Sequence, residues 1–333
     1  MPQSSGSTPD RHRSRAQLRT VRPDGTPVYR YPPRPGMPPV QVIRIDPEVD
    51  RPHLTTDGRH AHDFLVLVYI ERGGGAVAFG GQDTPLRDGD LHAVPPGLAI
   101  SAAEIVGLEH CRAWNVAFTP DAVPSLASVS PLAWAHHPLL ALFAGDAGTA
   151  SAGAGERTTG SEPATVSRAA SANVPEAERP RWASWLTELE EELADPGQVG
   201  ARDAASALLT RILIAAARLA PSAPVPPDPL VTRVFDEIEA TFRDRVSAAD
   251  VARALGYTPG YLTTVVRERT GRTLLDWITE RRMTEVRRML RDTDLPLGVV
   301  ASRTGLRDAT YLVRRFKDRY GTTPDRWRRD ERT

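Results

Sequence analysis

The sequence predicts a multidomain protein, with an N-terminal all-β barrel followed by helices and a C-terminal all-α domain. Two patterns predict this fold. From residue 41 to about 120, short runs of apolar and β-branched residues alternate with Gly and Pro turns, as in a barrel or sandwich. After residue 230, apolar residues recur every three or four positions, which is the spacing of helices. A length of 333 residues suits two or three such domains.

The β-rich domain, residues 41–143, is expected to lie between two segments without a core. Residues 1–40 are rich in Arg and then in Pro, which predicts a disordered arm. Residues 144–178 are mostly Ala, Gly, Ser, Thr and Glu, which predicts a flexible insertion. The strands expected between these segments cover residues 42–45, 64–70, 75–79, 91–94 and 112–118.

Two amphipathic helices are expected in residues 179–220. Their apolar stripes contain Trp182, Trp185, Leu186, Leu189 and Leu193 in the first helix and Ala205, Leu208, Leu209, Ile212, Leu213 and Ala216 in the second. Because neither helix can hide its stripe alone, we expect this segment to dimerise, with Trp182 and Trp185 facing a second copy. The alternative is that both stripes pack on the outer face of the barrel. The proline-rich residues 221–229 predict a stiff linker.

The distribution of charge indicates a polyanionic partner for the C-terminal domain. The chain as a whole is neutral, but residues 228–333 hold 22 basic and 17 acidic residues, a net charge of +5. Such an excess suits nucleic acid. The single cysteine, Cys111, excludes a disulfide framework and a cysteine-based zinc site. No membrane-spanning run and no secretory signal is visible, so we expect a cytoplasmic protein.

The C-terminal domain contains a repeated unit. The stretch from Val251 to Gly256 matches the stretch from Val300 to Gly305 at an offset of 49 residues. Beyond that glycine the offset becomes 50, as Tyr261 and Tyr311 show. A match at fixed offset over almost thirty positions indicates an internal duplication.

Each unit has the parts of a helix-turn-helix. In the first, Ser247 and Asp250 can form a capping box, Gly256 can end the helix, and Thr258 can cap the next one. In the second unit, Gly305 and Asp308 take the corresponding roles. The alternative is a repeated helical hairpin with a structural role alone.

Residues 230–329 resemble the DNA-binding domain of the AraC/XylS family of bacterial transcription regulators. The resemblance rests on three stretches: Leu255-Gly-Tyr-Thr-Pro-Gly-Tyr-Leu262, Arg287-Arg-Met-Leu-Arg-Asp-Thr-Asp294 and Phe316-Lys-Asp-Arg-Tyr-Gly-Thr-Thr-Pro324. One departure is Leu306, where the family usually has an aromatic residue. The resemblance implies that a helix over 274–291, about 27 Å long, sets two recognition helices in successive major grooves about 34 Å apart.

The resemblance also implies which residues face DNA. The groove-facing set is Gly260, Thr263, Thr264 and Arg267 on the first recognition helix, and Ala309, Thr310, Val313 and Arg314 on the second. Arg314 is the best candidate for bidentate reading of guanine. Expected phosphate contacts or solvated charges are Arg315, Lys317, Arg253, Arg272 and Arg303, and expected core residues are Tyr261, Leu262, Trp277, Leu312, Phe316 and Trp327.

The N-terminal domain resembles the cupin-like sensor domain common in this family. His60-Ala-His62 precedes a predicted strand, and Val94-Pro-Pro-Gly97 ends another. Cupin enzymes add a carboxylate and a later histidine, and that histidine is missing here, so two ligands are too few for a catalytic metal. We expect no metal and no cofactor, and take His60, His62, His92 and Trp114 as candidate effector-binding residues.

The favoured function is a sequence-specific transcription regulator that responds to a small-molecule effector. Its expected partners are double-stranded promoter DNA, a second copy of the chain and, as an open option, RNA polymerase. The rival is a cupin-type metal-dependent oxygenase or isomerase fused to a DNA-binding domain. A third alternative is a constitutive architectural DNA-binding protein with a vestigial barrel.

Overall fold

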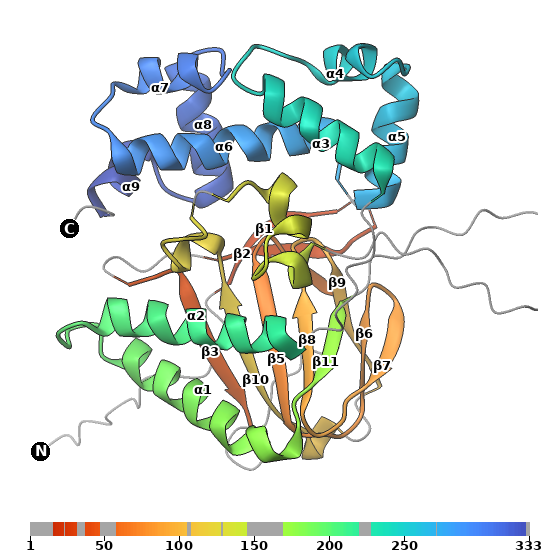
Figure 1. Cartoon of the computed structure of the whole chain (residues 1–333), viewed down its shortest axis with the longest axis vertical. Helices are drawn as coiled ribbons and strands as arrows, with labels where there is room; N and C mark the ends of the chain where they lie inside the picture. Colours follow the sequence, from red (N-terminus) through yellow and green to blue (C-terminus); the bar gives the residue numbers. More distant parts are fainter. Residues whose placement is uncertain are drawn as a thin grey trace, which may run out of the picture.

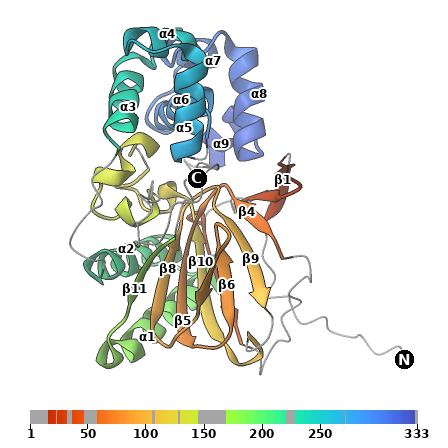
Figure 2. The ribbon, with the colours of Figure 1, turned by 90° about the vertical axis from the view of Figure 1, so that its right-hand side faces the viewer.

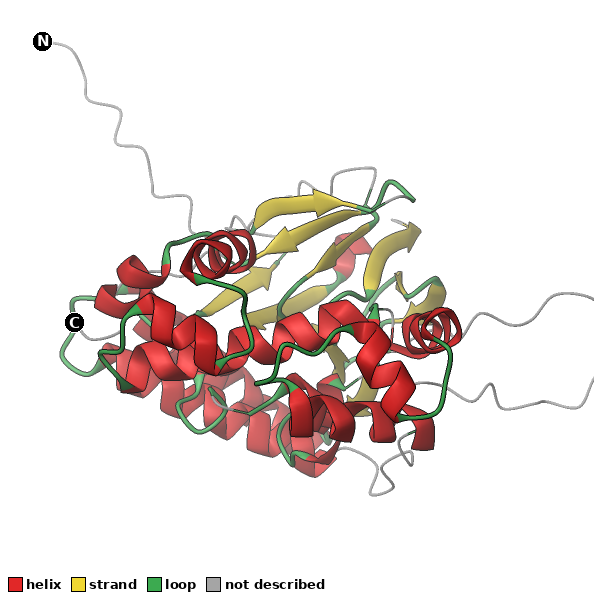
Figure 3. Cartoon of the chain, turned by 90° about the horizontal axis from the view of Figure 1, so that it is seen from above, coloured by secondary structure: helices red, strands yellow, loops and turns green. Residues whose placement is uncertain are grey.

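The structure is a computed structural model that describes residues 16–22, 24–31, 37–46, 58–104, 108–127, 129–144, 169–219, 228–270 and 272–330. A β-rich N-terminal domain and a helical C-terminal domain are stacked along the long axis of the molecule (Figure 1). Seen from above, the helices of the C-terminal domain lie over the strands (Figure 3). The predicted fold class is confirmed. Within the described residues no helix is both long and apolar enough to cross a bilayer.

Two sheets form the N-terminal domain. Their strand orders are β1-β2-β4-β9-β6-β7 and β11-β8-β5-β10-β3. The strands are β1 (Gln17–Val21), β2 (Pro27–Arg30), β3 (Val40–Ile45), β4 (His60–His62), β5 (Leu65–Arg72), β6 (Ala76–Phe79), β7 (Gln82–Pro85), β8 (Asp90–Val94), β9 (Ala99–Glu104), β10 (Arg112–Phe118) and β11 (Ala170–Asn173). The five strands predicted from the sequence are therefore present as β3, β5, β6, β8 and β10.

Part of the expected disordered arm is folded, so that expectation is wrong for the described residues. Strands β1 and β2 form a hairpin at the edge of the first sheet, where β2 pairs with β4. Burial of Val28 and Tyr31 holds the hairpin, and the Tyr31 hydroxyl donates a hydrogen bond of 2.9 Å to the carbonyl of Val40. Residues 1–15 and 32–36 of the arm lie outside the described residues.

The end of the expected flexible insertion is also ordered. Strand β11 pairs with β8 and completes the second sheet, and the next residue, Val174, is fully buried. Residues 145–168 of the insertion and residues 221–227 of the expected linker lie outside the described residues.

Helices α1 (Arg179–Ala194) and α2 (Ala201–Leu219) pack on the outer face of the second sheet. Trp182 is fully buried, with its ring 5.7 Å from that of Tyr69 on β5. Trp185 is 8% exposed. The expectation that these tryptophans face a second copy is wrong, because the sheet of the same chain covers both stripes, as in the alternative.

Helices α3 to α9 form the C-terminal domain around the long helix α6. They are α3 (Pro229–Thr241), α4 (Ala248–Ala254), α5 (Pro259–Thr270), α6 (Leu274–Asp292), α7 (Leu297–Arg303), α8 (Ala309–Tyr320) and α9 (Pro324–Asp330). One apolar core joins α3, α4, α5 and the start of α6, and a second joins the end of α6 to α7, α8 and α9. Each core belongs to one helix-turn-helix unit, so α6 spans both.

The predicted caps explain where these helices begin and end. Ser247 and Asp250 form the capping box of α4, and Asp308 accepts from the backbone of Tyr311 at the start of α8. Gly256 and Gly305 have φ angles of +79° and +69°, in the left-handed region that favours glycine. Both turns therefore follow from local sequence.

Candidate nucleic-acid interface

Helix α8 presents one polar face to solvent. Leu312 and Phe316 are fully buried on its inner side, and this fixes which residues point outward. Thr310, Arg314 and Lys317 are exposed there. Because positions three and four apart share a helix face, α8 offers a row of side chains that can reach base edges and phosphates in a major groove. Ala309 and Val313, also predicted to face the groove, are half-buried.

Two neighbouring arginines of α8, Arg314 and Arg315, differ in exposure and in hydrogen bonding. Arg315 is half-buried, and its Nε donates to the hydroxyl of Tyr311 at 3.1 Å. Arg314 is exposed, with its guanidinium 5.4 Å from the centre of the Tyr311 ring. Arg314 is therefore the arginine better placed to reach a base edge.

Helix α5 presents a smaller polar face. Gly260, Thr264 and Arg267 are exposed and Thr263 is half-buried, while Leu262 and Val266 are fully buried. Arg267 is the only long cationic side chain among the four predicted groove-facing residues of this helix. The first unit thus has fewer groups for reading bases by hydrogen bonds than the second.

Tyr261 was assigned to the core from the sequence, and that assignment is wrong. It is 51% exposed and stacks on Tyr257, with ring centres 5.6 Å apart. Its counterpart in the repeat, Tyr311, is half-buried against the second core. The exposure of Tyr261 could have been predicted from the helical spacing. Leu262 and Val266 fill the inner face of α5, so position 261 lies outside that face.

The remaining predicted phosphate contacts divide into two groups. Arg253 and Arg303 are exposed, and Arg253 pairs with Asp250 at 2.8 Å. Arg272 has a side chain only 22% exposed, 3.7 Å from Glu280, with its guanidinium over the Trp277 ring. Burial lowers the pKa of Arg272. A phosphate contact by Arg272 is therefore not supported, because its charge belongs to a cluster at the junction with the N-terminal domain.

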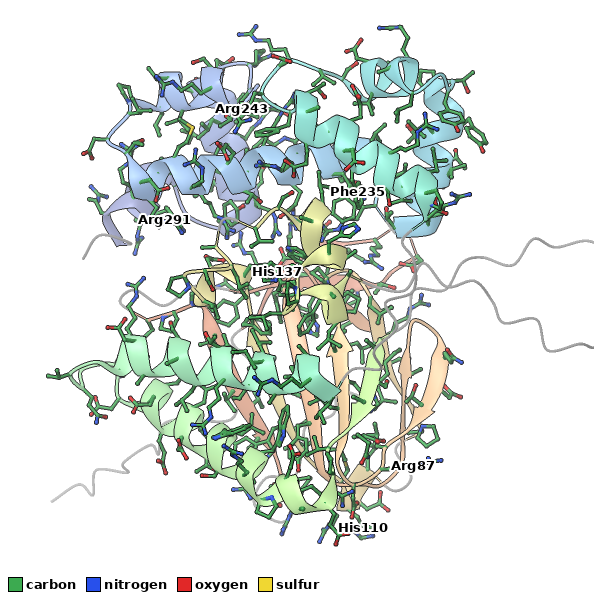
Figure 4. The ribbon with its side chains drawn as sticks, viewed as in Figure 1. Arg87, His110, His137, Phe235, Arg243 and Arg291 are labelled. Carbon is green, nitrogen blue, oxygen red and sulfur yellow. The ribbon has the colours of Figure 1, made fainter. Side chains whose placement is uncertain are left out.

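That junction contains acidic residues for which the sequence analysis predicted no role. Asp63 accepts hydrogen bonds from Arg19 of the hairpin and from Arg319 of α8, each at 2.9 Å. Arg287 of α6 donates to Asp121 at 2.7 Å. In Figure 4, His137 lies at this junction, whereas Arg87 and His110 lie at the far end of the barrel.

Among the predicted effector-binding residues, the two histidines of β4 lie together. The rings of His60 and His62 are 4.8 Å apart, and His60 Nδ1 donates to the carbonyl of Gly58 at 2.9 Å. Burial, with a smaller contribution from His60, lowers the pKa of His62 to about 3. Its Nδ1 is buried and has no hydrogen-bond partner among the described residues. His62 is thus a neutral, unsatisfied polar group.

His92 lies against the same apolar cluster as His62. The His62 ring is 4.6 Å from Phe64, the His92 ring is 5.2 Å from Phe79, and both phenylalanines belong to the cluster between the sheets. His92 Nδ1 shares a hydrogen bond of 2.9 Å with Ser171, and burial lowers its pKa. The described residues contain no group of three His, Cys, Asp or Glu side chains placed to hold a metal ion.

Trp114 does not join the three histidines, so its place in that set is wrong. It is 1% exposed in the core beneath α1 and α2, on the other face of the second sheet. Its Nε1 donates to Glu71 at 3.0 Å. In an antiparallel strand neighbouring side chains alternate between faces, and Trp114 has the parity of Val116 and Phe118, which face the helices.

A paired helix-turn-helix domain joined to a two-sheet domain defines the class of two-domain transcription regulators. Comparison with known proteins gives the same division. Residues 251–330 match the family model of a helix-turn-helix domain, and residues 46–140 match that of an AraC-like ligand binding domain. The chain belongs to the AraC family, in agreement with the resemblance seen in its sequence.

Similar curated proteins match about a quarter of the chain. The multiple antibiotic resistance protein MarA of Escherichia coli is 28% identical over 95 residues, which are 28% of this chain and 75% of MarA. The uncharacterized HTH-type transcriptional regulator YisR of Bacillus subtilis is 28% identical over 92 residues, 28% of this chain and 32% of YisR. The match with YisR thus spans about a third of that relative's length.

Two solved structures to which the chain is similar have low TM-scores. The DNA-binding domain of AdpA, solved with a target DNA, has 25% identity and a TM-score of 0.30, covering 32% of this chain and 94% of that one. ToxT from Vibrio cholerae has 8% identity and a TM-score of 0.36, covering 87% of this chain and 97% of that one.

Proposed function

We propose that the protein is a sequence-specific DNA-binding transcription regulator. The observation that carries this proposal is the pair of helix-turn-helix units joined by α6, each with an exposed polar face on its second helix. Helix α6 has 19 residues and is about 28 Å long. That length suits placing α5 and α8 in successive major grooves of one face of the duplex. The proposed contacts are the groove-facing residues predicted above, together with Arg315 and Lys317.

We further propose that the N-terminal domain binds a small-molecule effector near His60, His62 and His92. The support is the set of imidazoles against an apolar core, in which the His62 Nδ1 and His92 Nε2 atoms are buried without a hydrogen-bond partner among the described residues. An unpartnered buried nitrogen gains most from a ligand that hydrogen-bonds to it. A homodimer, contact with RNA polymerase and a cytoplasmic location belong to the same proposal. The dimer needs a surface other than the buried stripes of α1 and α2, and the mass of the protein in solution tests it.

Binding of the full chain to genomic DNA fragments tests the central proposal. Affinity should fall steeply with salt, with a log–log slope of about −0.9 per phosphate neutralised. Residues 228–333, with a net charge of +5, should retain binding when separated from the rest. A folded full-length protein that retains no DNA at low salt would contradict the proposal. If the protein does bind DNA, mapping the bound sites across a genome would identify the operator.

One observation favours a second candidate function, a metal-dependent enzyme of the cupin type. His60 and His62 lie side by side on β4, as a metal-binding pair would. The metal content of the purified protein separates the two candidates. Stoichiometric iron, zinc or manganese would support the enzyme, and His60→Ala and His62→Ala would be the first variants to make.

A further inference from the structure

We propose that the β1–β2 hairpin extends the DNA-binding surface beyond α8 and contacts backbone phosphates on the flank of the second unit's site. This inference rests on the proposed function and adds a contact made by the N-terminal domain. The occupant is the phosphate backbone of the same duplex that α8 reads. Its support is a cleft shared by the hairpin and α8, the charges in that cleft, and its continuity with the groove-facing row of α8.

The cleft lies between the hairpin and the C-terminal end of α8. Its volume is about 640 Å³, and its lining residues are Leu18, Arg19, Thr20, Arg30, Lys317, Asp318 and Gly321. Three of these side chains are cationic and one is acidic. Arg19 is paired with Asp63 at 2.9 Å, so Arg30 and Lys317 are the cations that the cleft offers to a phosphate. Since DNA carries one negative charge for about every 1.7 Å of helix axis, a cleft with this excess of positive charge suits its backbone.

The position of Arg30 fixes the hairpin against α8. A Cβ built on Gly321, the residue that ends α8, would lie 2.9 Å from the Cζ atom of Arg30. The guanidinium therefore lies over the end of the recognition helix, where a cation is favoured by the partial negative charge of the last carbonyls. Figure 2 shows β1 directly below α8, on the side of the molecule where α8 lies.

Lys317 belongs both to the groove-facing row of α8 and to the lining of the cleft. It follows Thr310, Val313 and Arg314 on one side of α8 by helical spacing, and it lines the cleft as well. The N-terminal residues of a recognition helix contact bases, so the C-terminal end of α8 meets the sugar-phosphate backbone at the groove wall. The next positive group beyond Lys317 is Arg30 of the hairpin, with Arg19, which is paired with Asp63, in the same cleft.

The outer edge of strand β1 is unpaired among the described strands, and its residues are exposed to solvent. Among the described strands it pairs with β2 alone, and all five of its residues are exposed. Leu18 is 57% and Val21 55% exposed. Phosphate contacts position a protein without reading sequence, so this hairpin would add affinity that does not depend on the flanking bases.

Charge changes at Thr20 test the inference in the full-length protein, because this exposed side chain lines the cleft without belonging to a core. The binding of Thr20→Lys and Thr20→Glu is compared on two duplexes that carry the same site. One extends about one helical turn, 10 bp, beyond the half-site of the second unit, and the other ends there. On the long duplex, Thr20→Lys should tighten binding several-fold and raise the log–log salt slope by about 0.9. Thr20→Glu should weaken binding, and neither change should matter on the short duplex.

The matched control is Gln82 on β7, at the opposite edge of the same sheet. Gln82→Lys and Gln82→Glu make the same charge changes on an exposed strand and should leave both duplexes unaffected. Equal effects at Thr20 and Gln82, or equal effects on both duplexes, would overturn the hairpin contact while leaving DNA binding intact. If a charge change at Thr20 instead alters the mass of the protein in solution, the unpaired edge of β1 binds a second copy of the chain. That result would also overturn the inference. Loss of all binding by the unchanged protein would overturn the proposed function itself, and the hairpin contact with it.

Discussion

At the scale of single residues, the two neighbouring arginines of α8 have different surroundings and should have different roles. Arg314 is exposed, whereas the Nε of Arg315 is hydrogen-bonded to Tyr311 on the same helix. A side chain that is held along its own helix can reach a phosphate at the groove wall, but it is poorly placed for the two parallel hydrogen bonds that read guanine.

We therefore expect Arg314→Ala to reduce binding to the cognate site by about 1–3 kcal/mol and to relax the preference at one base position. Arg315→Ala should weaken cognate and random DNA to the same extent and lower the log–log salt slope by about 0.9. Binding titrations of both variants on both kinds of DNA measure these effects. Equal losses on cognate and random DNA for Arg314→Ala would show that Arg314 does not read a base.

Single residues also show where sequence reasoning reached its limit. The outward positions of α8 could be predicted because Leu312 and Phe316 fix its inner face. The location of Trp114 could not be predicted, because both faces of its sheet are apolar. The alternation of side chains along the strand does not by itself say which face lies against the histidines. The burial of Arg272 depends on Glu280 and on the N-terminal domain, and neither is visible from its own sequence neighbours.

At the scale of elements, the turns of the two helix-turn-helix units differ in how closely they are packed. Gly256 and Gly305 occupy the same place in the repeat, and both have positive φ angles. A Cβ on Gly256 would meet nothing within 4 Å, whereas one on Gly305 would press on the carbonyl oxygens of Phe242 and Asp244. The second turn therefore packs against the chain that follows α3, and the first turn is open.

We expect Gly256→Ala to cost about 1–2 kcal/mol of stability, the usual penalty of a left-handed non-glycine residue. Gly305→Ala should cost about 1–3 kcal/mol more, because the added methyl group overpacks the contact with the residues that follow α3. Urea unfolding of the full chain, followed by circular dichroism, measures both changes. Equal costs at the two positions would mean that the close contact at Gly305 relaxes freely.

Elements that depend on local signals were predictable, and those that depend on distant pairing were not. The caps at Ser247 and Asp308 place α4 and α8 to within a residue or two. Strand β11 forms because Ser171 pairs with His92, 79 residues earlier in the chain. The hairpin in the polar arm is similar, because its burial comes from β3 and β4 and not from its own composition.

At the scale of the whole molecule, buried ion pairs join the two domains. Asp121 and Arg287 pair at 2.7 Å, with side chains 14% and 11% exposed. Burial alone would raise the pKa of Asp121, but the neighbouring Arg287 guanidinium brings it below its usual value. Arg319 bridges Asp63 of the N-terminal domain and Glu280 of α6. Leu132 adds an apolar contact by packing into the core of the first helix-turn-helix unit.

We expect Asp121→Asn to separate the domains rather than to unfold them. Removing one partner of a buried pair costs about 3–5 kcal/mol, and the chain can avoid most of that cost by exposing Arg287 to water. Small-angle scattering should show a larger radius of gyration, and thermal unfolding should divide into two transitions. Asp292→Asn is the matched control, because this carboxylate pairs with Arg288 on the surface of the same helix, where such pairs contribute about 0–1 kcal/mol. A single transition and an unchanged radius for Asp121→Asn would contradict the prediction.

The same junction should make the folded chain sensitive to acid in a defined range. Burial alone would raise the pKa of Glu280, but Arg319 and Arg272 together lower it from 4.5 to about 2. A carboxyl with a lowered pKa stays charged in the folded state, while in the unfolded chain it takes up a proton near pH 4.5. Its contribution is therefore fully present above pH 4.5 and is lost as the pH falls toward 2, and the lowered pKa of Asp121 acts in the same direction. The thermal midpoint of the wild-type protein should fall across this range, and Glu280→Gln should start lower at neutral pH and fall less. Parallel profiles for the two proteins would show that Glu280 does not carry the acid sensitivity.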